Sequence, residues 1–328
     1  MLKKILVFRT DRIGDLIVNC PSIITIKEYF QNSEITLVAS DKNIEYAKSL
    51  NIFKNIYKFP KKNFFKKIKL INKLNKEKYD FIFIFDGKER SILSTYFIES
   101  KLKVALTQSF KFYYKFLKIK FFKDSYKTNL NDIFKEMLSH CNINTEIKHY
   151  DFLKTKQDNA FSRKISTTNY VHIHLDEKWF SNLYIETYTN INPSYNQFTE
   201  FLINISKIDN VLITTGINET DLVNELKNRF FEKESNNIFI NKKFKNIIYL
   251  IYKPSFEDIE SLLRNSKILI ACHGAITHAS NSFKVKKIDI LEKSKLSFYN
   301  RFTSYLHDYH TAYRSSFDVL IGEISKKL

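Results

Sequence analysis

Short apolar runs alternate with longer segments of helical spacing along the chain. The β-type runs are residues 5–8, 35–39, 81–85, 104–106, 170–175, 211–214, 247–251, 268–271 and 285–291. The segments between them are long enough for helices. This alternation predicts parallel strands joined by helical crossovers, and therefore an α/β fold class. The run 81–85 is apolar on both faces, as expected of a strand that helices cover on either side.

The two series of runs indicate two domains. Residues 150–168 between them are polar and lack a sustained period, so the boundary is expected there. We predict an N-terminal domain over 1–160, a second domain over 161–310 and a closing helix in 311–328, for which packing back on the first domain is one expected arrangement. That helix would place Phe317, Leu320, Ile321 and Ile324 on one face. Two αβα domains that face each other across a cleft are the simplest architecture.

Composition limits the class of protein. The chain has 328 residues, 44% of them hydrophobic, which is enough for two cores. No window reaches the roughly 18 apolar residues of a membrane span, and the first run is too short for a secretory signal, so a cytoplasmic protein is expected. Cys20, Cys141 and Cys272 have no spacing typical of a disulfide framework or a zinc site.

The net charge of +18, from 53 Lys+Arg against 35 Asp+Glu, favours an anionic partner such as nucleic acid, anionic lipid or a phosphorylated substrate. The chain also over-uses Lys, Asn, Ile, Phe and Tyr, which AT-rich coding DNA alone would produce. Both explanations of the charge stay open at this point.

Four of the five glycines, Gly14, Gly87, Gly216 and Gly274, each follow a predicted strand and precede a predicted helix. Ligands of open α/β sheets bind at such turns, where a helix offers free N–H groups and glycine lets a ligand approach. Ordinary tight turns are the alternative. Asp15, directly after Gly14, is either a helix N-cap or a general base for an attacking hydroxyl. Pro21 should kink or restart the first helix six residues on.

These residues resemble the sequence pattern of glycosyltransferase family 9, the bacterial heptosyltransferases of lipopolysaccharide core assembly. The strongest match is Arg9-x-Asp11-Arg12-Ile13-Gly14-Asp15-x(5)-Pro21 directly after the first apolar run. Weaker matches follow in the same order: Tyr79-Asp80-Phe81-Ile82 leading to Asp86-Gly87; His172-Ile173-His174 leading to Lys178-Trp179; Thr214-Thr215-Gly216 with Glu219; and Ala271-Cys272-His273-Gly274-Ala275-Ile276-Thr277-His278.

The resemblance implies a GT-B fold, with two Rossmann-like domains across a cleft, and inverting transfer of a sugar from a nucleotide-sugar donor to a lipid-linked saccharide acceptor. It implies Asp15 as the catalytic base and Lys178 as the cation that neutralises the diphosphate, with a solvated surface lysine as the alternative. Other residues expected at the substrates are Arg12, Gly14, Thr215, Gly216, Glu219, Cys272, His273, Gly274, Ala275 and His278. No cofactor or metal is expected, because the chain has no Asp-x-Asp pair and Lys178 with helix N-termini can replace a divalent ion.

The turn at Gly274 departs from the family pattern. The family usually has Asp-Ser/Thr-Gly there, with a histidine three residues after the glycine, whereas this chain has Cys272-His273-Gly274 and His278. The donor is therefore expected to be ADP-heptose-like or another nucleotide-sugar. His273 and His278 are candidate contacts to phosphate or sugar hydroxyls, unless His278 merely packs on its helix and His273 is exposed.

Residues 61–78 and 110–123 interleave lysines with apolar and aromatic residues. Such segments suit an anionic membrane surface, and they also suit partly buried helices with lysine-rich outer faces. RNA binding is less favoured, because no recognised RNA-binding motif accompanies the charge.

The sequence therefore predicts an inverting glycosyltransferase of cell-surface glycolipid assembly, cytoplasmic and peripheral at the inner face of the inner membrane. The alternatives are a catalytically divergent nucleotide-sugar-binding or scaffold protein of the same fold and, less favoured, a nucleic-acid-binding protein.

Overall fold

The computed structural model describes residues 2–125, 127–165, 169–180 and 185–328. The chain forms two compact units, residues 1–152 with Asn300–Tyr305 and residues 153–299 with Leu306–Leu328. The boundary falls eight residues before the expected position at 160. Part of the expected linker, residues 166–168, lies outside the described residues.

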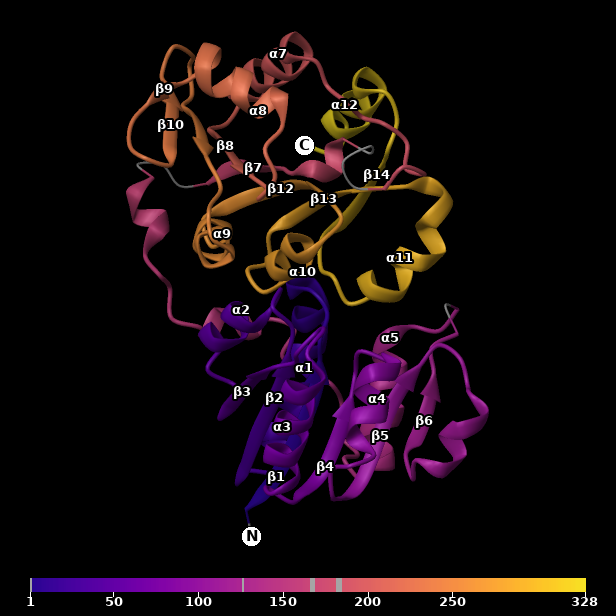
Figure 1. The fold of residues 1–328 in the computed structure, drawn as a ribbon. Helices are drawn as coiled ribbons and strands as arrows, with labels where there is room; N and C mark the ends of the chain where they lie inside the picture. The colour runs from indigo at the N-terminus through magenta and orange to yellow at the C-terminus, as the bar shows by residue number, and fades with distance from the viewer. Residues whose placement is uncertain (1, 126, 166–168, 181–184) are drawn as a thin grey trace. The chain divides into compact units, whose positions relative to one another are not determined.

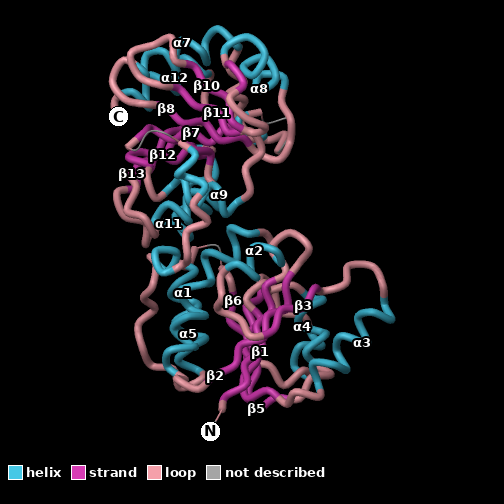
Figure 2. Tube along the Cα trace, turned by 90° about the vertical axis from the view of Figure 1, so that its left-hand side faces the viewer, coloured by secondary structure: helices cyan, strands magenta, loops and turns pink. Residues whose placement is uncertain are grey.

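The first unit contains a parallel sheet of six strands in the order β3-β2-β1-β4-β5-β6 (Figure 1). Its strands are β1 Lys3–Arg9, β2 Ser33–Ala39, β3 Asn55–Lys58, β4 Tyr79–Ile84, β5 Ser100–Thr107 and β6 Lys120–Lys123. Its helices are α1 Ile13–Tyr29, α2 Ile44–Ser49, α3 Phe64–Asn75, α4 Glu89–Thr95 and α5 Leu130–His140, with a short 3-10 turn η1 Phe112–Phe116. Figure 2 shows α1 and α5 on one face of this sheet and α3 and α4 on the other. The core strand β1 is therefore apolar on both faces, and Ile5 through Phe8 are fully buried.

The second unit contains a sheet in the order β14-β13-β12-β7-β8-β11-β10-β9, in which β9–β10 and β10–β11 pair antiparallel and the other described neighbours pair parallel. Its strands are β7 Tyr170–Leu175, β8 Val211–Thr215, β9 Glu232–Lys233, β10 Ile238–Asn241, β11 Ile248–Ile251, β12 Ser266–Cys272, β13 Lys286–Leu291 and β14 Tyr309–Tyr313. Its helices are α7 Tyr195–Ser206, α8 Asp221–Glu225, α9 Phe256–Leu263, α10 Ala275–Asn281, α11 Leu296–Thr303 and α12 Phe317–Ser325. Short turns are η2 Phe152–Thr155, η3 Phe161–Lys164, η4 Glu177–Trp179, the π-helical η5 Leu226–Phe230 and η6 Lys293–Lys295. Helices α7, α8 and α12 cover one face and α9 and α10 the other (Figure 1).

The apolar runs of the sequence are confirmed as strands, and four glycines lie where those strands lead into helices. Gly87, between β4 and α4, has a φ of +59°, in the left-handed region that favours glycine. Gly14 lies in the first turn of α1 rather than in a separate turn before it. The strands that the sequence did not predict, β3, β6, β9, β10 and β14, are short or lie at the sheet edges.

Two expectations about helices differ from the structure. Helix α1 does not restart at Pro21, which lies inside it, because buried residues on both sides of the proline hold the helix against the core. Helix α12 belongs to the second unit rather than packing back on the first: Phe317, Leu320 and Ile324 join the core that contains α7. The apolar face predicted for this helix is confirmed.

Among the described residues, we find no helix whose length and apolar character would let it cross a bilayer.

Candidate functional site

In the first unit the candidate site lies at the carboxyl ends of β1, β2 and β4. The strand order reverses between β1 and β4, and open α/β sheets bind ligands at such a point. A pocket of about 410 Å³ opens there. Its lining residues are Thr10, Asp11, Arg12, Asp15, Ser40, Asp41, Lys42, Lys61, Lys88 and Arg90.

Asp15 is held at the start of α1 by two contacts. The backbone N–H of Arg12, the N-cap residue, donates to Asp15 Oδ2 at 3.1 Å. The guanidinium of the buried Arg9 lies 3.5 Å from Asp15 Oδ1 and also donates to the Asp15 carbonyl at 3.1 Å. The carboxylate is 43% exposed, so a hydroxyl can reach it. Asp15, the third residue of helix α1, therefore caps the helix while its carboxylate stays accessible to a ligand. The capping role does not exclude a role as the general base.

Residues that follow β4 support the pocket through hydrogen bonds and an ion pair. Asp86 accepts hydrogen bonds from the hydroxyls of Thr10 and Ser91 at 2.6 and 2.7 Å. Lys88 forms an ion pair with Asp11 and donates to the Thr10 carbonyl at 2.9 Å. Burial, assisted by the neighbouring arginines, lowers the pKa of Lys88 to about 8.

Lys88 and Arg90 were not among the residues predicted from the sequence. They could have been found from their position two and four residues after Asp86, because Asp86 follows the strand that pairs with β1. Arg90 donates to Thr10 Oγ1 at 3.1 Å, while its Nε is buried without a hydrogen-bond partner among the described residues.

In the second unit the candidate site is at the carboxyl ends of β7, β8, β12 and β13. The strand order reverses between β7 and β12. Lys178 follows β7 in η4, and its Nζ lies 2.9 Å from Asp176 Oδ2 and donates to the carbonyls of Cys272 and His273 at 3.2 and 3.0 Å. The side chain is only 14% exposed, so Lys178 is not a solvated surface lysine.

Two glycines leave room for this lysine and its loop. A Cβ at Gly274 would lie 2.4 Å from Lys178 Nζ, and a Cβ at Gly216 would lie 2.8 Å from both Asp176 Cβ and Glu177 Oε2. Both distances are below any ordinary contact. The turns after β8 and β12 therefore have glycine because residues 176–178 come close to their backbones.

Some of the remaining predicted residues are exposed to a ligand, and others are buried. Glu219 is exposed; hydrogen bonds from Tyr252 and Lys253 hold its pKa below the usual value. Thr215 is buried, and its Oγ1 accepts the Lys253 N–H at 2.8 Å. The Cys272 side chain is buried, which raises its pKa to about 12, so it contributes to the site only through its carbonyl. Ala275 begins α10 and is half-buried.

The two histidines at the Gly274 turn have different environments. His278 is buried; burial, then His273 and Lys178, lower its pKa well below the usual value, so it is neutral. His273 keeps 12% of its side chain exposed, and its Nδ1 lies 2.7 Å from Oδ2 of the buried Asp289. His278 is therefore buried on α10, whereas His273 is anchored by Asp289 rather than simply exposed.

Behind the site lie buried groups, of which Arg314 was not predicted from the sequence. Arg314, after β14, donates to the Lys178 carbonyl at 2.5 Å and contacts Cys272 Sγ at 3.5 Å. His172 and His174 on β7 share the hydroxyl of Thr214 at 2.8 and 2.9 Å. Burial lowers the pKa of His174 to about 3, so these two histidines belong to the core and not to the site.

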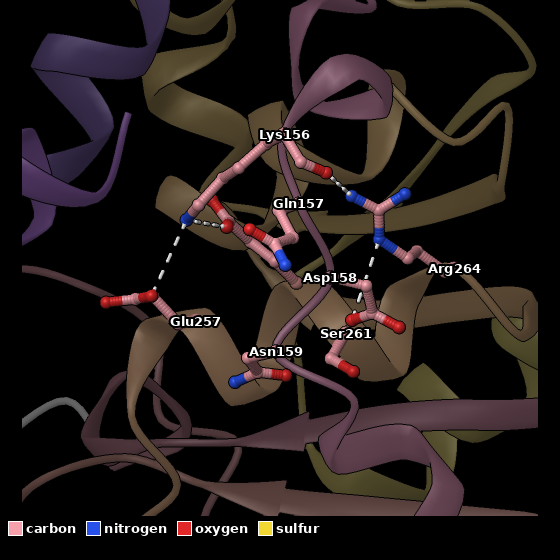
Figure 3. A pocket seen from close by; sticks show the side chains of 8 residues that line it. Lys156, Gln157, Asp158, Asn159, Glu257, Ser261 and Arg264 are labelled. Carbon is pink, nitrogen blue, oxygen red and sulfur yellow. Dashed lines mark hydrogen bonds and ion pairs between the residues drawn. The ribbon is translucent and has the colours of Figure 1, made fainter. Parts of the chain in front are cut away.

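A second small cavity near α9 is structural. In Figure 3, Lys156 reaches toward Glu257, and its ammonium is 2.5 Å from Glu260, while Arg264 donates to the Lys156 carbonyl at 2.8 Å. The cavity encloses about 10 Å³, which is room for roughly one water. These contacts tie the segment before β7 to α9.

Comparison with solved structures finds the same architecture in glycosyltransferases. A glycosyl transferase family 9 protein from Veillonella parvula aligns over 99% of this chain and 90% of its own, with a TM-score of 0.68 at 14% identity. The E. coli heptosyltransferase WaaC, solved with ADP-2-deoxy-2-fluoro heptose, covers 99% and 100% with a TM-score of 0.68 at 10% identity. The E. coli ADP-heptose lps heptosyltransferase II covers 99% and 97% with a TM-score of 0.68 at 11% identity. This chain has the fold of the family 9 glycosyltransferases.

The resemblance inferred from the sequence is thereby confirmed for the fold, a GT-B arrangement of two Rossmann-like units. No protein-family model matches the chain. No curated protein matches it either. Within this GT-B fold, the two candidate sites occupy the corresponding carboxyl edges of the two sheets.

Proposed function

We propose that the chain is an inverting glycosyltransferase that moves a heptose or another hexose-type sugar from a nucleotide-sugar to a lipopolysaccharide or other cell-surface glycolipid. The observation that carries the proposal is the half-exposed Asp15 carboxylate, fixed at the edge of a 410 Å³ pocket at the switch point of the first sheet. The GT-B fold, and the donor analogue in WaaC, support a nucleotide-sugar as the substrate of the second unit.

The donor diphosphate is assigned to Lys178 and the glycine turns around it. The ammonium has three N–H donors, and in the free protein it has an acidic side chain and two backbone carbonyls as partners. A diphosphate oxygen can replace a carbonyl at this ammonium. The fixed charge then stabilises the leaving nucleoside diphosphate without a divalent ion. Activity is accordingly expected to survive EDTA.

The acceptor is assigned to the pocket of the first unit. Its hydroxyl donates a proton to Asp15 while its oxygen forms the new bond to the anomeric carbon, and the bond to the diphosphate breaks with inversion. The pocket that contains Asp15 is lined by more cations than carboxylates, which suits an acceptor that carries phosphate or carboxylate groups near the reacting hydroxyl. The cations are Arg12, Lys42, Lys61, Lys88 and Arg90, and the carboxylates are Asp11, Asp15 and Asp41.

Substitution of Asp15 tests the assignment. Asp15→Asn keeps an acceptor for the Arg12 N–H, so the fold and donor binding should stay intact while transfer falls by about 10²- to 10⁴-fold. Glu45→Gln is the control, because Glu45 is an exposed carboxylate on α2 that does not line the pocket and pairs with Lys48 at 2.9 Å. Full activity in Asp15→Asn would exclude the base.

Calorimetry against a panel of nucleotide-sugars separates the enzyme from the alternative. A nucleotide-sugar that binds selectively but is never transferred would favour the divergent binding or scaffold protein. The buried Cys272, where the family has a carboxylate, is the feature that favours this alternative.

We also propose that an aromatic face of the first unit binds an anionic bilayer. Helix α3, the end of α4 and η1 pack on the same apolar cluster, and so belong to one face of the sheet. The exposed aromatic residues on these elements or directly beside them are Phe64, Phe65, Tyr96, Phe97, Phe110, Phe112 and Phe116. Phe65 and Phe112 are each 81% exposed. The helices expected over 61–78 and 110–123 are therefore half right: α3 forms, but 110–123 is a 3-10 turn followed by the edge strand β6.

The charge of the aromatic face suits a membrane. Residues 61–78 contain eight lysines and one glutamate, Glu77. Each lysine near an anionic bilayer contributes about 1 kcal/mol, and exposed aromatic rings are stable at the headgroup level. Binding on the cytoplasmic side of the inner membrane would bring a lipid-linked acceptor to the enzyme.

Vesicle sedimentation tests this surface. The protein should bind phosphatidylcholine vesicles that contain phosphatidylglycerol, and binding should weaken with salt and in a Phe65→Ser, Phe112→Ser variant. Ile208→Ser, Val319→Ser is the matched control, since both residues are exposed and apolar on the second unit. Equal binding to neutral vesicles, or equal loss in the control, would contradict the proposal.

A further inference from the structure

Asp289 on β13 is a carboxylate sealed behind the Gly274 turn. Only 1% of the residue is exposed, and it lies opposite Ala271 in the neighbouring strand. Its Oδ1 accepts the hydroxyl of Thr277 at 2.9 Å, and its Oδ2 accepts the hydroxyl of Tyr309 at 2.8 Å. The third contact is His273 Nδ1 at 2.7 Å from Oδ2. A buried charge is stable only when its oxygens are satisfied, and these three groups do so.

The carboxylate fixes the state of the His273 ring. An ionised carboxylate only accepts hydrogen bonds, so His273 Nδ1 carries the hydrogen and Nε2 is the nitrogen left for a ligand. No hydrogen-bond partner of Nε2 is found among the described residues, and Nε2 is not one of the buried atoms without a partner. The ring is also held by Tyr299 at 4.7 Å and by His278 at 5.1 Å between centroids. His273 is therefore oriented before any ligand arrives.

His273 is also next to the proposed diphosphate site. Its carbonyl accepts the Lys178 ammonium at 3.0 Å, and the following residue is Gly274, whose missing Cβ leaves room for that ammonium. Two groups that can carry positive charge thus flank one glycine turn. The sequence pattern of the family has a serine or threonine at this place, so the histidine is a property of this chain.

We propose that His273 binds a phosphate oxygen of the donor through a protonated Nε2–H, and that Asp289 is the positioning residue that holds the imidazolium there. This inference rests on the proposed function, because it needs a diphosphate at Lys178. When the donor binds, the imidazole takes up one proton from solvent, and the Nε2–H···O–P hydrogen bond forms without any covalent step. The imidazolium then shares with Lys178 the charge that develops on the leaving group.

The charges that face the ring favour this coupling. The titratable groups on the elements packed around it are Asp289 on β13, Tyr309 on β14, Tyr299 on α11, His278 on α10 and Lys178 in η4. His278 is neutral because it is buried. Asp289 is thus the carboxylate in contact with the ring, and the negative charge of a bound diphosphate would lie on the Lys178 side of the same turn.

Isothermal titration calorimetry of the full chain tests the inference. Nucleoside diphosphates and inorganic pyrophosphate are titrated at pH 6 and pH 8, in buffers of different ionisation enthalpy, so that protons taken up are counted. We expect tighter binding at pH 6 with net proton uptake. In His273→Gln the uptake should disappear, and binding at pH 6 should weaken about tenfold, the loss of one charged hydrogen bond. Asp289→Asn should move the pH dependence to lower pH.

A matched control exists on the same strand as Tyr309. His310 Nε2 lies 2.9 Å from Asp308 Oδ1 at the amino end of β14, away from the carboxyl edge that carries the site. His310→Gln should leave affinity and proton uptake unchanged. Circular dichroism checks that each variant is folded. If Asp289→Asn does not fold, the test rests on His273→Gln, which changes a partly exposed position.

The outcomes separate the two proposals. If the wild type binds a nucleoside diphosphate but His273→Gln keeps the same affinity and proton uptake, His273 does not contact the phosphate and the donor site itself stands. If the wild type binds neither nucleoside diphosphate nor pyrophosphate, both the inference and the proposed donor site are wrong.

Discussion

Gly274→Ala should move the Lys178 ammonium without removing it. The new Cβ would lie 2.4 Å from Nζ, whereas ordinary contacts begin at 3.4 Å, so Nζ has to move by about 1.0 Å, the difference of the two distances. The carbonyls of Cys272 and His273 accept hydrogen bonds from Nζ at 3.2 and 3.0 Å, and a shift of this size directed away from either carbonyl takes that bond beyond hydrogen-bond range.

The magnitude follows from those contacts. Loss of one charged hydrogen bond together with local overpacking lowers the free energy of unfolding of the second unit by about 1–3 kcal/mol. A catalytic group misplaced by about 1 Å reduces the rate by about 10²-fold. Gly322→Ala is the control, because nothing lies within 4 Å of its Cβ position inside α12. That substitution should raise stability by about 0.5–1 kcal/mol and leave activity unchanged.

The assay combines urea unfolding with calorimetric binding of the donor or its nucleoside diphosphate. A double-mutant cycle with Lys178→Met identifies the cause, since Gly274→Ala should do little more harm once the ammonium is absent. Unchanged stability and donor affinity in Gly274→Ala, or an equal loss in the Lys178→Met background, would refute the close approach of these two residues as the reason for the glycine.

Two further substitutions test buried cations. Arg301→Met leaves the carboxylate of Asp124 without its ion-pair partner in the first unit, and both side chains are at least nine-tenths buried. The free energy of unfolding should therefore fall by about 3–5 kcal/mol in urea titrations, and a loss below about 1 kcal/mol would contradict the pairing. Burial lowers the pKa of Lys287 from 10.5 to about 8. The unfolded chain then binds more protons than the folded chain between these values, so wild-type stability should gain up to about 3 kcal/mol as pH rises through that window, relative to Lys287→Met. If the free energy of unfolding changes with pH equally in the wild type and in Lys287→Met, the lowered pKa of Lys287 is contradicted.

The sequence was informative about strands because central parallel strands are buried on both faces. Residues 5–8 and 81–85 are continuous apolar runs, and both are core strands. The edge strand β6, Lys-Phe-Phe-Lys, pairs on one side only and is half-exposed. Because two of its four residues are lysines, it has no continuous apolar run from which a strand could be predicted. Pro21 misled the prediction because a local propensity of about 3 kcal/mol is smaller than the packing of a buried helix around it.

Only those site residues that directly follow an apolar run could be predicted from the sequence. Asp15, Lys178 and Gly274 stand directly after apolar runs, so their place at a carboxyl edge followed from the alternation of elements. Asp289 and Arg314 reach the same site through the pairing of β12 with β13 and β13 with β14. Nothing in their local sequence marks them, because strand order is a tertiary property.

Both candidate sites hold their reactive groups by contacts to charged side chains that are in place before any substrate binds. Asp15 is fixed by Arg9, Lys178 by Asp176 and His273 by Asp289. Such preorganisation spares the reorganisation that water would need in the transition state, but it also means that a diphosphate competes with protein acceptors for the Lys178 ammonium. One lysine that already has three protein acceptors is a weak counter-charge for a diphosphate. A second group beside Gly274 that gains its charge only when the anion arrives would meet this need, and that is why the histidine at position 273 matters to the proposed chemistry.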